Sequence, residues 1–237
     1  VGGVGLLLVS TGAVIAIQPL WAFDLLGWAM PRILWRVETN EPLVALSFDD
    51  GPAPDHTPQV LEILSKHKAH ATFFLIGDRA MAYPDLVARL RMGDHEVGNH
   101  YFTIRSTVRA SDDEFLANLT RTEHVLGLQG PNKLFRPPGG RIRPVHRRLA
   151  EEHGYRVVLG SAYPYDGSRT PSAYIRWLVT KNLAPGVIVI LHDGIADPSR
   201  MLNVLDSILS AGDRKGLRFV TVGELLRASA KAGPPPE

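Results

Sequence analysis

Two adjacent aspartates, Asp49 and Asp50, directly follow the short apolar run from Leu43 to Phe48. Side-by-side carboxylates repel each other, so burying both requires a nearby cation. A bound metal ion together with Arg136 would supply that charge. Because consecutive residues at a strand end point in different directions, one aspartate can bind a metal while the other faces a substrate. A surface turn is the alternative interpretation, since Asp, Gly and Pro are common turn formers.

Histidines and an arginine stand at the ends of other short runs. His100 follows residues 96–99, Arg136 opens an Arg-Pro-Pro-Gly-Gly segment, and His192 follows the apolar residues 187–191. A histidine can act as a general acid near neutral pH or as a metal ligand. The alternative for both histidines is a structural role in hydrogen bonds to the backbone. Because parallel α/β barrels place catalytic groups at the ends of their strands, the recurrence of such residues there favours a catalytic site.

Extended and helical patterns alternate along the chain from Glu41 onward. Ser111 with Glu114 three residues later forms a capping box, which predicts a helix beginning there. Seven strands separated by helices predict an α/β fold with a parallel sheet curled into a barrel. The expected strands are 43–48, 71–76, 96–99, 134–136, 156–159, 187–191 and 218–222, and the expected helices are 57–66, 84–92, 111–128, 144–152, 173–182 and 201–209.

Composition limits the classes of protein that remain. The chain has 237 residues, of which 45% are hydrophobic and 21% charged, as in ordinary globular domains. A net charge of +2 is too balanced for nucleic-acid binding, which requires a concentrated basic surface. The absence of cysteine excludes disulfides, thiol nucleophiles and cysteine–zinc sites. We therefore expect one catalytic domain over residues 37–230, without a nucleic-acid partner and monomeric.

The two ends of the chain differ from this domain. Residues 1–36 carry no charge before Asp24, and Trp21 and Trp28 suit a membrane interface. We expect an uncleaved signal-anchor there, so that the protein is membrane-anchored with its catalytic domain extracytoplasmic. A cleaved signal peptide and a buried core helix are the alternatives. Residues 231–237 are expected to form a flexible tail.

Four segments together resemble the polysaccharide deacetylase, or NodB-homology, domain of carbohydrate esterase family four. These segments are SFDDGP at 47–52, HEVGNH at 95–100, FRPPGG at 135–140 and VILHDG at 189–194. They occur in the family's order, and the resemblance extends over residues 43–226. It implies a distorted (β/α) barrel of about seven parallel strands. It also implies metal-assisted hydrolysis of the amide in N-acetylated sugars.

The resemblance assigns roles to individual residues. Asp49 would be the general base that activates water, Arg136 would keep Asp49 ionised, and His192 would protonate the leaving amine. Asp50 and His100 would hold a divalent metal, expected to be zinc. The residues expected to contact the substrate are Gly139 through its N–H group, Leu191 in the acetyl pocket, Tyr101 and Asp166.

One expected metal ligand is missing from this sequence. The family's second motif reads His-x-x-x-His, and Ile104 stands where the second histidine would fall. The chain is similar to a divergent branch that lacks this histidine and carries a segment like the GSAYPYD of residues 160–166. Three protein ligands are usual for catalytic zinc, so we expect weak metal binding unless His95, Asp94 or His56 replaces the missing ligand.

These observations predict a hydrolase that removes N-acetyl groups from an amino-sugar polysaccharide or glycolipid. The alternative is a catalytically weakened, glycan-binding pseudoenzyme of the same fold. A protein that only binds sugar does not need a base, its arginine partner and an acid together, which favours the enzyme. A hydrolase acting on a different C–N bond is a third possibility.

Overall fold

The structure is a computed structural model that describes residues 12–232. Its eight strands are all parallel. Of these strands, β2 makes the most contacts with other elements. The strands are β1 (Ile33–Leu34), β2 (Leu43–Asp49), β3 (Thr72–Leu75), β4 (Glu96–Asn99), β5 (Lys133–Phe135), β6 (Tyr155–Val158), β7 (Ile188–His192) and β8 (Arg218–Val220).

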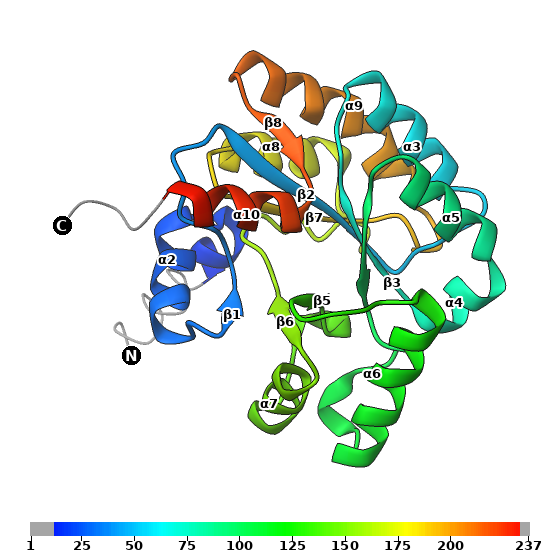
Figure 1. The fold of residues 1–237 in the computed structure, drawn as a ribbon. Helices are drawn as coiled ribbons and strands as arrows, with labels where there is room; N and C mark the ends of the chain where they lie inside the picture. Colours follow the sequence, from blue (N-terminus) through cyan, green and yellow to red (C-terminus); the bar gives the residue numbers. More distant parts are fainter. Residues whose placement is uncertain (1–11, 233–237) are drawn as a thin grey trace, which may run out of the picture.

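Helices cover the outside of the sheet (Figure 1). They are α2 (Leu20–Ala29), α3 (Thr57–Lys66), α4 (Gly77–Ala82), α5 (Pro84–Met92), α6 (Asp112–Leu126), α7 (Pro144–Glu152), α8 (Ser172–Asn182), α9 (Ser199–Arg214) and α10 (Val222–Ala232), with short 3₁₀ turns η1 (Thr107–Arg109) and η2 (Pro138–Gly140).

The sheet has the order β1-β6-β5-β4-β3-β2-β7, and β8 pairs with the start of β2. The chain leaving β6 crosses to β7, where Ser161 N–H donates to the Ile188 carbonyl over 3.0 Å and Ala162 bridges to Val189. This contact brings the two ends of the sheet together, so the sheet curls around a central axis (Figure 1). The α/β prediction of a distorted barrel of about seven parallel strands is confirmed.

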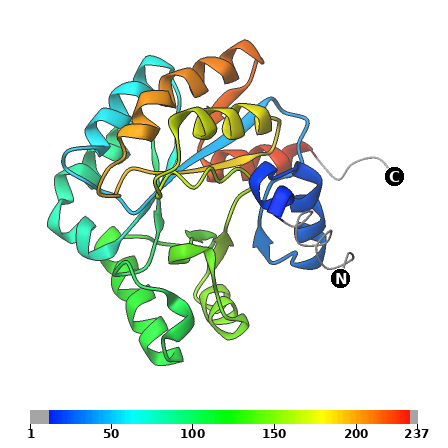
Figure 2. The same cartoon turned by 180° about the vertical axis from the view of Figure 1, so that it is seen from behind.

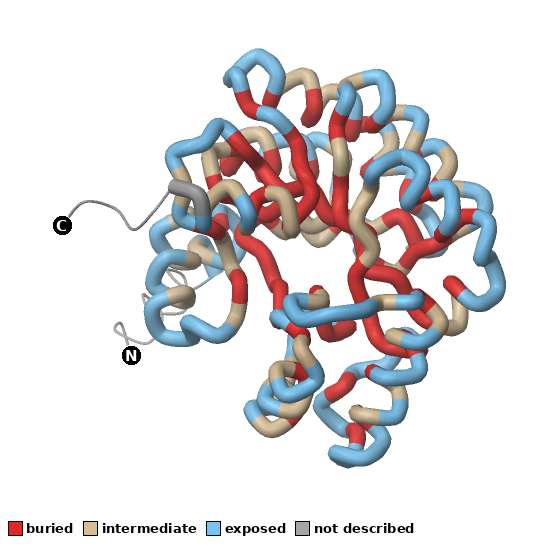
Figure 3. Tube along the Cα trace, viewed as in Figure 1, coloured by how far each residue is buried: buried red, intermediate tan, exposed pale blue. Residues whose placement is uncertain are grey.

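The strands are short and most of their residues are buried, as the burial colouring of Figure 3 shows. All seven residues of β2 are buried, which is expected for a parallel strand covered on both faces. Outward-facing residues such as Phe48 and Leu191 pack against Val60 of α3 and Leu205 of α9 in the main core cluster. Inward-facing residues of β2 and β7 are therefore left to line the barrel, and these include the polar residues at the strand ends.

Several expected boundaries agree with the structure. The helices expected at 57–66, 84–92 and 144–152 begin and end at those residues. Ser111 caps α6 as expected, because its Oγ accepts a hydrogen bond from Glu114 N–H over 3.2 Å. The last strand ends at Val220 instead of Val222, because Val222 N–H donates to Thr72 Oγ1 at the start of α10. β1, α4 and α10 were not expected from the sequence, because they are short or follow another element without a separating turn.

The N-terminal segment packs against the domain. β1 pairs with β6 in the register Ile33 to Val157, so the sheet begins before the boundary expected at residue 37. Leu20 of α2 packs against the main core cluster. The first eleven residues of the expected anchor lie outside the described residues, as do the last residues of the expected tail. Across the part of the chain that is described, every helix is too short or too polar to cross a membrane.

Candidate active site

Asp49 and His192 are the last residues of the adjacent strands β2 and β7. They are register partners across this parallel pair. Paired residues of parallel strands point to the same face of the sheet, so both side chains point toward the inside of the barrel. Ser47 and Ile190, two residues earlier in each strand, form another such pair. The structure thus brings together the residues expected to act as base and acid.

Asp49 is held by Arg136, which directly follows β5 on the opposite side of the barrel. The Arg136 Nη1 donates to Asp49 Oδ1 over 2.6 Å and to Ser47 Oγ over 2.8 Å. Its Nε donates to the Val158 carbonyl over 3.2 Å, and its guanidinium lies 4.0 Å from the centre of the Phe74 ring. These contacts fix one carboxylate oxygen of Asp49 and leave the other directed into the site.

The Asp49–Arg136 pair is buried on both sides, with side-chain exposures of 6% and 2%. Burial lowers the pKa of Arg136 from its ordinary value, and the charge and hydrogen bond of Asp49 oppose that shift. A buried ion pair of this kind is costly to break, because removing one partner leaves an uncompensated charge. The pair therefore gives the Asp49 carboxylate a defined orientation.

His192 is held from behind by Asp166. The Nδ1–H of His192 donates to Asp166 Oδ1 over 2.9 Å, and the His192 backbone N–H donates to Oδ2 over 2.8 Å. Burial alone lowers the pKa of His192, but the hydrogen bond and charge of Asp166, with the charges of Asp49 and Asp50, raise it to about 9. His192 is therefore cationic at neutral pH, which is the form that can donate a proton.

Asp166 was expected to contact the substrate, and the structure places it differently. Its side chain is fully buried and both of its oxygens bond to His192. The carboxylate therefore contacts His192 and not the open part of the site. This arrangement fixes the ring orientation and leaves Nε2 as the nitrogen that is directed away from Asp166.

Asp50 and His100, the expected metal ligands, lie together. The His100 Nε2 is 3.4 Å from Asp50 Oδ1, and its Nδ1–H donates to the Arg136 carbonyl over 2.6 Å. A backbone carbonyl on one ring nitrogen selects the tautomer in which the other nitrogen is free to bind a metal. Burial by itself raises the pKa of Asp50, but the hydrogen bond and charge of His100, with the charges of His192 and Arg79, lower it overall. Both donors fit one side of a divalent-metal site.

The described residues provide no third ligand of the expected kind. Ile104 is 50% exposed on the loop that follows β4, and residues 12–232 contain no group of three or more acids, histidines or cysteines arranged to hold a metal. His95 accepts a hydrogen bond from Ala71 N–H and, like Asp94, precedes β4 at the opposite end of the sheet. His56 lines a separate hollow. None of the three substitutes considered from the sequence lies with Asp50.

Gly139 lies beside Ile104. It has a φ of 70°, a left-handed conformation that glycine adopts without strain. Together with Ile104, Pro138 and Arg141 it lines a hollow of about 370 Å³. A Cβ at Gly139 would meet no atom within 4 Å, so a substrate group has room to approach its backbone. This place is compatible with the expected hydrogen bond from Gly139 to a carbonyl oxygen.

The expectation for Leu191 is wrong. Its side chain is fully buried in the main core cluster between the sheet and the helices. Side chains alternate along a strand, so the neighbour of His192 points away from the barrel while Ile190, two residues earlier, shares its face. Ile190 is partly exposed and is the residue of β7 that borders the site.

Tyr101 was also expected to contact the substrate, and the structure buries it instead. Its ring stacks on Phe115 with centroids 5.9 Å apart, and only 2% of the residue is exposed. Its φ of 74° and the bond from its N–H to Asn99 Oδ1 turn the chain away from the site just after His100. The tyrosine therefore supports the loop on which Ile104 lies and does not offer a surface for a sugar.

Tyr163 borders the site beside His192. Its ring lies 5.7 Å from that of His192. Burial raises the pKa of Tyr163 to about 12, and the charges of Asp166, Asp49 and Asp50 contribute to the shift. The phenol is therefore neutral and lies close to the acidic residues, where it can donate a hydrogen bond.

Asp193 was not identified from the sequence, although it directly follows His192. It is fully buried, and its Oδ2 accepts a 2.5 Å hydrogen bond from Thr57 Oγ1. Burial raises the pKa of Asp193 to about 7, while the Thr57 bond opposes the shift. A Cβ on Gly51 would lie 2.7 Å from Asp193 Oδ1, so glycine is required where the chain turns after Asp50.

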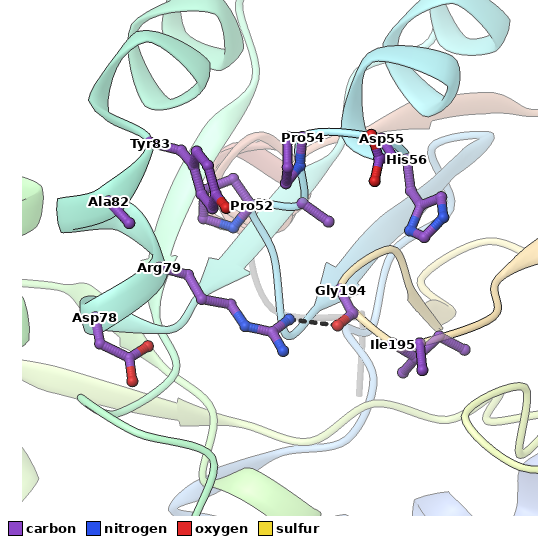
Figure 4. Close-up of a pocket in the computed structure, with 12 residues that line it drawn as sticks. Pro52, Pro54, Asp55, His56, Asp78, Arg79, Ala82, Tyr83, Gly194 and Ile195 are labelled. Atoms are coloured by element: carbon purple, nitrogen blue, oxygen red, sulfur yellow. Dashed lines mark hydrogen bonds between the residues drawn. The ribbon is translucent and has the colours of Figure 1, made fainter.

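Arg79 of α4 joins the ends of the two catalytic strands. Its Nη1 donates to the Asp50 carbonyl over 2.6 Å and to the Gly194 carbonyl. Figure 4 shows Arg79 beside Gly194 in a hollow of about 500 Å³ that His56, Asp78 and Tyr83 also line. The residues that line this hollow do not include Asp49, Asp50 or His192.

Comparisons with known proteins agree with this geometry. A family model described as polysaccharide deacetylase matches residues 36–158. The peptidoglycan-N-acetylglucosamine deacetylase of Bacillus cereus is 40% identical over 199 residues, covering 82% of this chain and 93% of that protein. The crystal structure of the Bc1960 peptidoglycan N-acetylglucosamine deacetylase has a TM-score of 0.78 at 30% identity, covering 84% of this chain and 95% of that one.

A second solved structure that resembles this chain is a mutant of a pseudoenzyme. A mutant of BA3943, a CE4 family pseudoenzyme of Bacillus anthracis, with restored enzymatic activity, has a TM-score of 0.74 at 26% identity. It covers 83% of this chain and 71% of the other.

The fold and the comparisons together define a hydrolase that acts on the carbon–nitrogen bonds of linear amides. This chain belongs to the polysaccharide deacetylase family.

Proposed function

We propose that this protein removes N-acetyl groups from the amino sugars of peptidoglycan and releases acetate. The proposal is supported by the names of its relatives and by one structural observation. Asp49 and His192 lie side by side at the ends of adjacent strands, and each is held by a partner of opposite charge. A base and an acid so placed can act on the two sides of one amide.

Asp49 acts as the general base in this mechanism. Its Oδ1 is bonded to Arg136, so Oδ2 is the atom that takes a proton from water. Arg136 keeps the carboxylate anionic until the proton is transferred. As the water attacks, charge develops on the carbonyl oxygen of the acetyl group, and in this proposal the N–H of Gly139 donates to that oxygen.

His192 acts as the general acid. Its Nδ1–H stays bonded to Asp166, and Nε2–H donates the proton to the nitrogen of the departing amine. The raised pKa of about 9 keeps this proton on the ring at neutral pH. Breaking the amide requires this step, because an unprotonated amine is a poor leaving group.

Polysaccharide deacetylases generally depend on a divalent metal, and Asp50 and His100 are the residues that would hold it here. When bound, the metal would polarise the acetyl carbonyl and lower the pKa of water. We propose zinc as the ion, held weakly because Ile104 replaces a ligand. The Nε2 of His100, which faces Asp50 Oδ1 at 3.4 Å, and the lowered pKa of Asp50 support a site for a cation.

A glycan-binding pseudoenzyme is the second candidate, and the missing ligand at Ile104 favours it. The two ion pairs favour an enzyme, because a binding protein gains nothing from a buried Asp49–Arg136 pair next to a protonated histidine. The similarity to a pseudoenzyme whose mutant regained activity makes this alternative worth a direct test.

Acetate release by the purified protein from peptidoglycan and from N-acetylglucosamine oligomers tests the proposal, with and without added zinc. We expect release from peptidoglycan that rises with zinc and disappears in Asp49→Asn. Sugar binding without acetate release at any zinc concentration would instead identify the pseudoenzyme. Release from a glycolipid but not from peptidoglycan would keep the chemistry and change the substrate.

We further propose that the protein acts as a monomer at the membrane, with its catalytic domain on the extracytoplasmic side where peptidoglycan lies. The uncharged sequence of residues 1–23 supports this location. Membrane fractionation of the native cells and protease treatment of intact cells would test it. Cleavage of the catalytic domain only after the cells are opened would contradict the extracytoplasmic orientation.

A further inference from the structure

The N-terminal segment exposes a cluster of large apolar side chains on one side of the molecule. We call it the tryptophan face, and it consists of Ile15, Ile17, Trp21, Leu25, Trp28, Met30 and Trp177, all between 37% and 82% exposed. Three of the four tryptophans of the chain belong to it. Exposed apolar clusters of this kind usually contact a partner or a membrane.

The exposed residues of α2 follow a helical spacing. Trp21, Leu25 and Trp28 lie three and four residues apart and therefore share one side of the helix. On the other side, Leu20 packs on the main core and Phe23 lies 6.3 Å from the Trp35 ring. A helix that is apolar all round is normally buried, yet no residue of α2 is buried in this chain. Something must cover its outer side.

Asp24 lies three residues after Trp21 and four before Trp28, on the same side of α2, and its side chain is 54% exposed, so its charge needs a partner there. This one charged residue of α2 is bonded to Arg36 over 2.8 Å. Lys181 of α8 lies 5.5 Å from the centre of the Trp177 ring, at the edge of the tryptophan face. A cation at the edge of an apolar, tryptophan-rich surface matches the headgroup region of a bilayer, where tryptophan is enriched and lysine meets anionic lipids.

The chain leading out of this face is also apolar. Residues 1–11, outside the described part, read VGGVGLLLVST and contain no charge. We propose that the tryptophan face lies in the headgroup layer of a lipid bilayer, with α2 parallel to the membrane plane. This surface contact is distinct from a membrane-spanning anchor, because it uses side chains of the folded domain itself. It does not depend on the reaction that the active site performs.

The tryptophan face is joined to the edge of the active site by hydrogen bonds. The side chain of Gln18, itself 5% exposed, donates from Nε2 to the Tyr163 carbonyl over 2.5 Å and accepts from Tyr163 N–H over 2.8 Å. Tyr163 in turn lies beside the His192 ring. An amide that bonds both backbone groups of one residue fixes the position of the two segments relative to each other.

α8 adds two further bonds to the same segment. Tyr174 Oη donates to the Ala16 carbonyl over 2.7 Å, and Lys181 Nζ donates to the Ile17 carbonyl over 2.6 Å. Figure 2 shows α2 and the preceding residues beside α8 on this side of the molecule. Contact of the tryptophan face with a membrane would therefore hold the active site at a set height and orientation above the lipid.

Vesicle binding by the full chain tests the inference. The variant Trp21→Ser/Leu25→Ser/Trp28→Ser is compared with Met81→Ser/Met92→Ser/Val108→Ser, which removes exposed apolar side chains elsewhere. On vesicles of phosphatidylethanolamine and phosphatidylglycerol, we expect the first variant to lose roughly a thousandfold in partitioning, since each of the three large side chains contributes about tenfold. The control should change by less than about twofold. Equal binding by both variants and wild type would overturn the inference.

Tryptophan fluorescence separates the face from residues 1–11. Brominated phospholipids in the vesicles should quench the emission of the wild type, and Trp21→Phe/Trp28→Phe should bind equally while losing most of the quenchable emission. Binding without quenching in the wild type would mean that residues 1–11 alone contact lipid, and would refute the proposal. A dimer in lipid-free sedimentation that Trp21→Ser/Leu25→Ser/Trp28→Ser abolishes, without vesicle binding, would assign the face to a second copy and refute it as well.

Discussion

Asp49 and His192 are register partners on adjacent parallel strands, and each is held from behind by a residue of opposite charge. Arg136 reaches Asp49 across the barrel, while Asp166 reaches His192 from the loop that follows β6. The two functional groups are therefore fixed independently of each other. Replacing either partner should change the properties of one group while leaving the other in place.

Replacing the base should remove activity with little loss of structure. In Asp49→Asn the side chain can still accept from Arg136 but cannot take a proton from water. We expect kcat to fall by about 10²- to 10⁴-fold, the usual contribution of a general base. Acetate release and circular dichroism would measure the two effects, with Asp85→Asn on the surface of α5 as the control. Asp49→Asn with most of its activity retained would contradict the role of this residue.

Breaking the buried ion pair should destabilise the fold. Arg136→Met leaves the Asp49 carboxylate buried without its cation, so we expect the free energy of unfolding in urea to fall by about 3–5 kcal/mol. The double variant Arg136→Met/Asp49→Leu should regain most of this loss, because no unpaired charge remains, but it should stay inactive. Arg147→Met removes a partly exposed pair with Glu151 and should cost less than about 1 kcal/mol. Additive losses in the double variant would show that the two charges do not interact.

Removing Asp166 should lower the pKa of His192. The pKa is about 9 in the folded protein and 6.5 ordinarily, so the folded state binds the extra proton between these values. His192 therefore contributes stability that is full below pH 6.5 and is lost as pH rises through 9. In Asp166→Asn the anion is gone, so the stability contributed by His192 should be lost at lower pH than in the wild type. The alkaline decline in activity should also move to lower pH. NMR titration of the His192 ring in metal-free protein measures the shift, and an unchanged pKa would rule out Asp166 as its cause.

Restoring a ligand should tighten metal binding. Ile104 is exposed beside Gly139 at the place where the resemblance puts a histidine. Ile104→His should increase zinc affinity at least tenfold in calorimetry, since even changes outside the ligand set alter affinity by about tenfold to a hundredfold. Val108→His, on the same loop and also exposed, is the matched control. Tight binding by the wild type, with no gain from the histidine, would mean that another group completes the site.

The repeating pattern of apolar runs and helical spacing was sufficient to predict the fold class and most elements. Parallel strands that are buried on both faces are continuous apolar runs, so β2 and β7 are visible in the sequence. The ends of β2, β4, β5 and β7 then identify Asp49, Asp50, His100, Arg136 and His192 without any coordinates. β1 and α10 escaped detection, because two residues are too few for a periodic pattern and α10 begins directly after β8 without a turn signal.

Only the tertiary structure decided which way the neighbouring residues point and which partners they meet. Leu191 and Ile190 are both aliphatic residues of the same size. The pleat of β7 nevertheless buries Leu191 in the core and turns Ile190 toward the site. Tyr101 is in the expected motif, yet its positive φ sends its ring into the core. Such outcomes depend on strand register and backbone direction, which the order of residue types does not specify.

The pairs that tune the site are likewise long-range. Arg136 meets Asp49 across 87 positions of sequence, and Gln18 meets Tyr163 across 145. The sequence alone determined the family, the barrel and the identity of the reactive groups, because these follow from local patterns of residue type. The raised pKa of His192, the burial of Asp166 and the link from the tryptophan face to the active site depend on chain segments that only folding brings within hydrogen-bond distance.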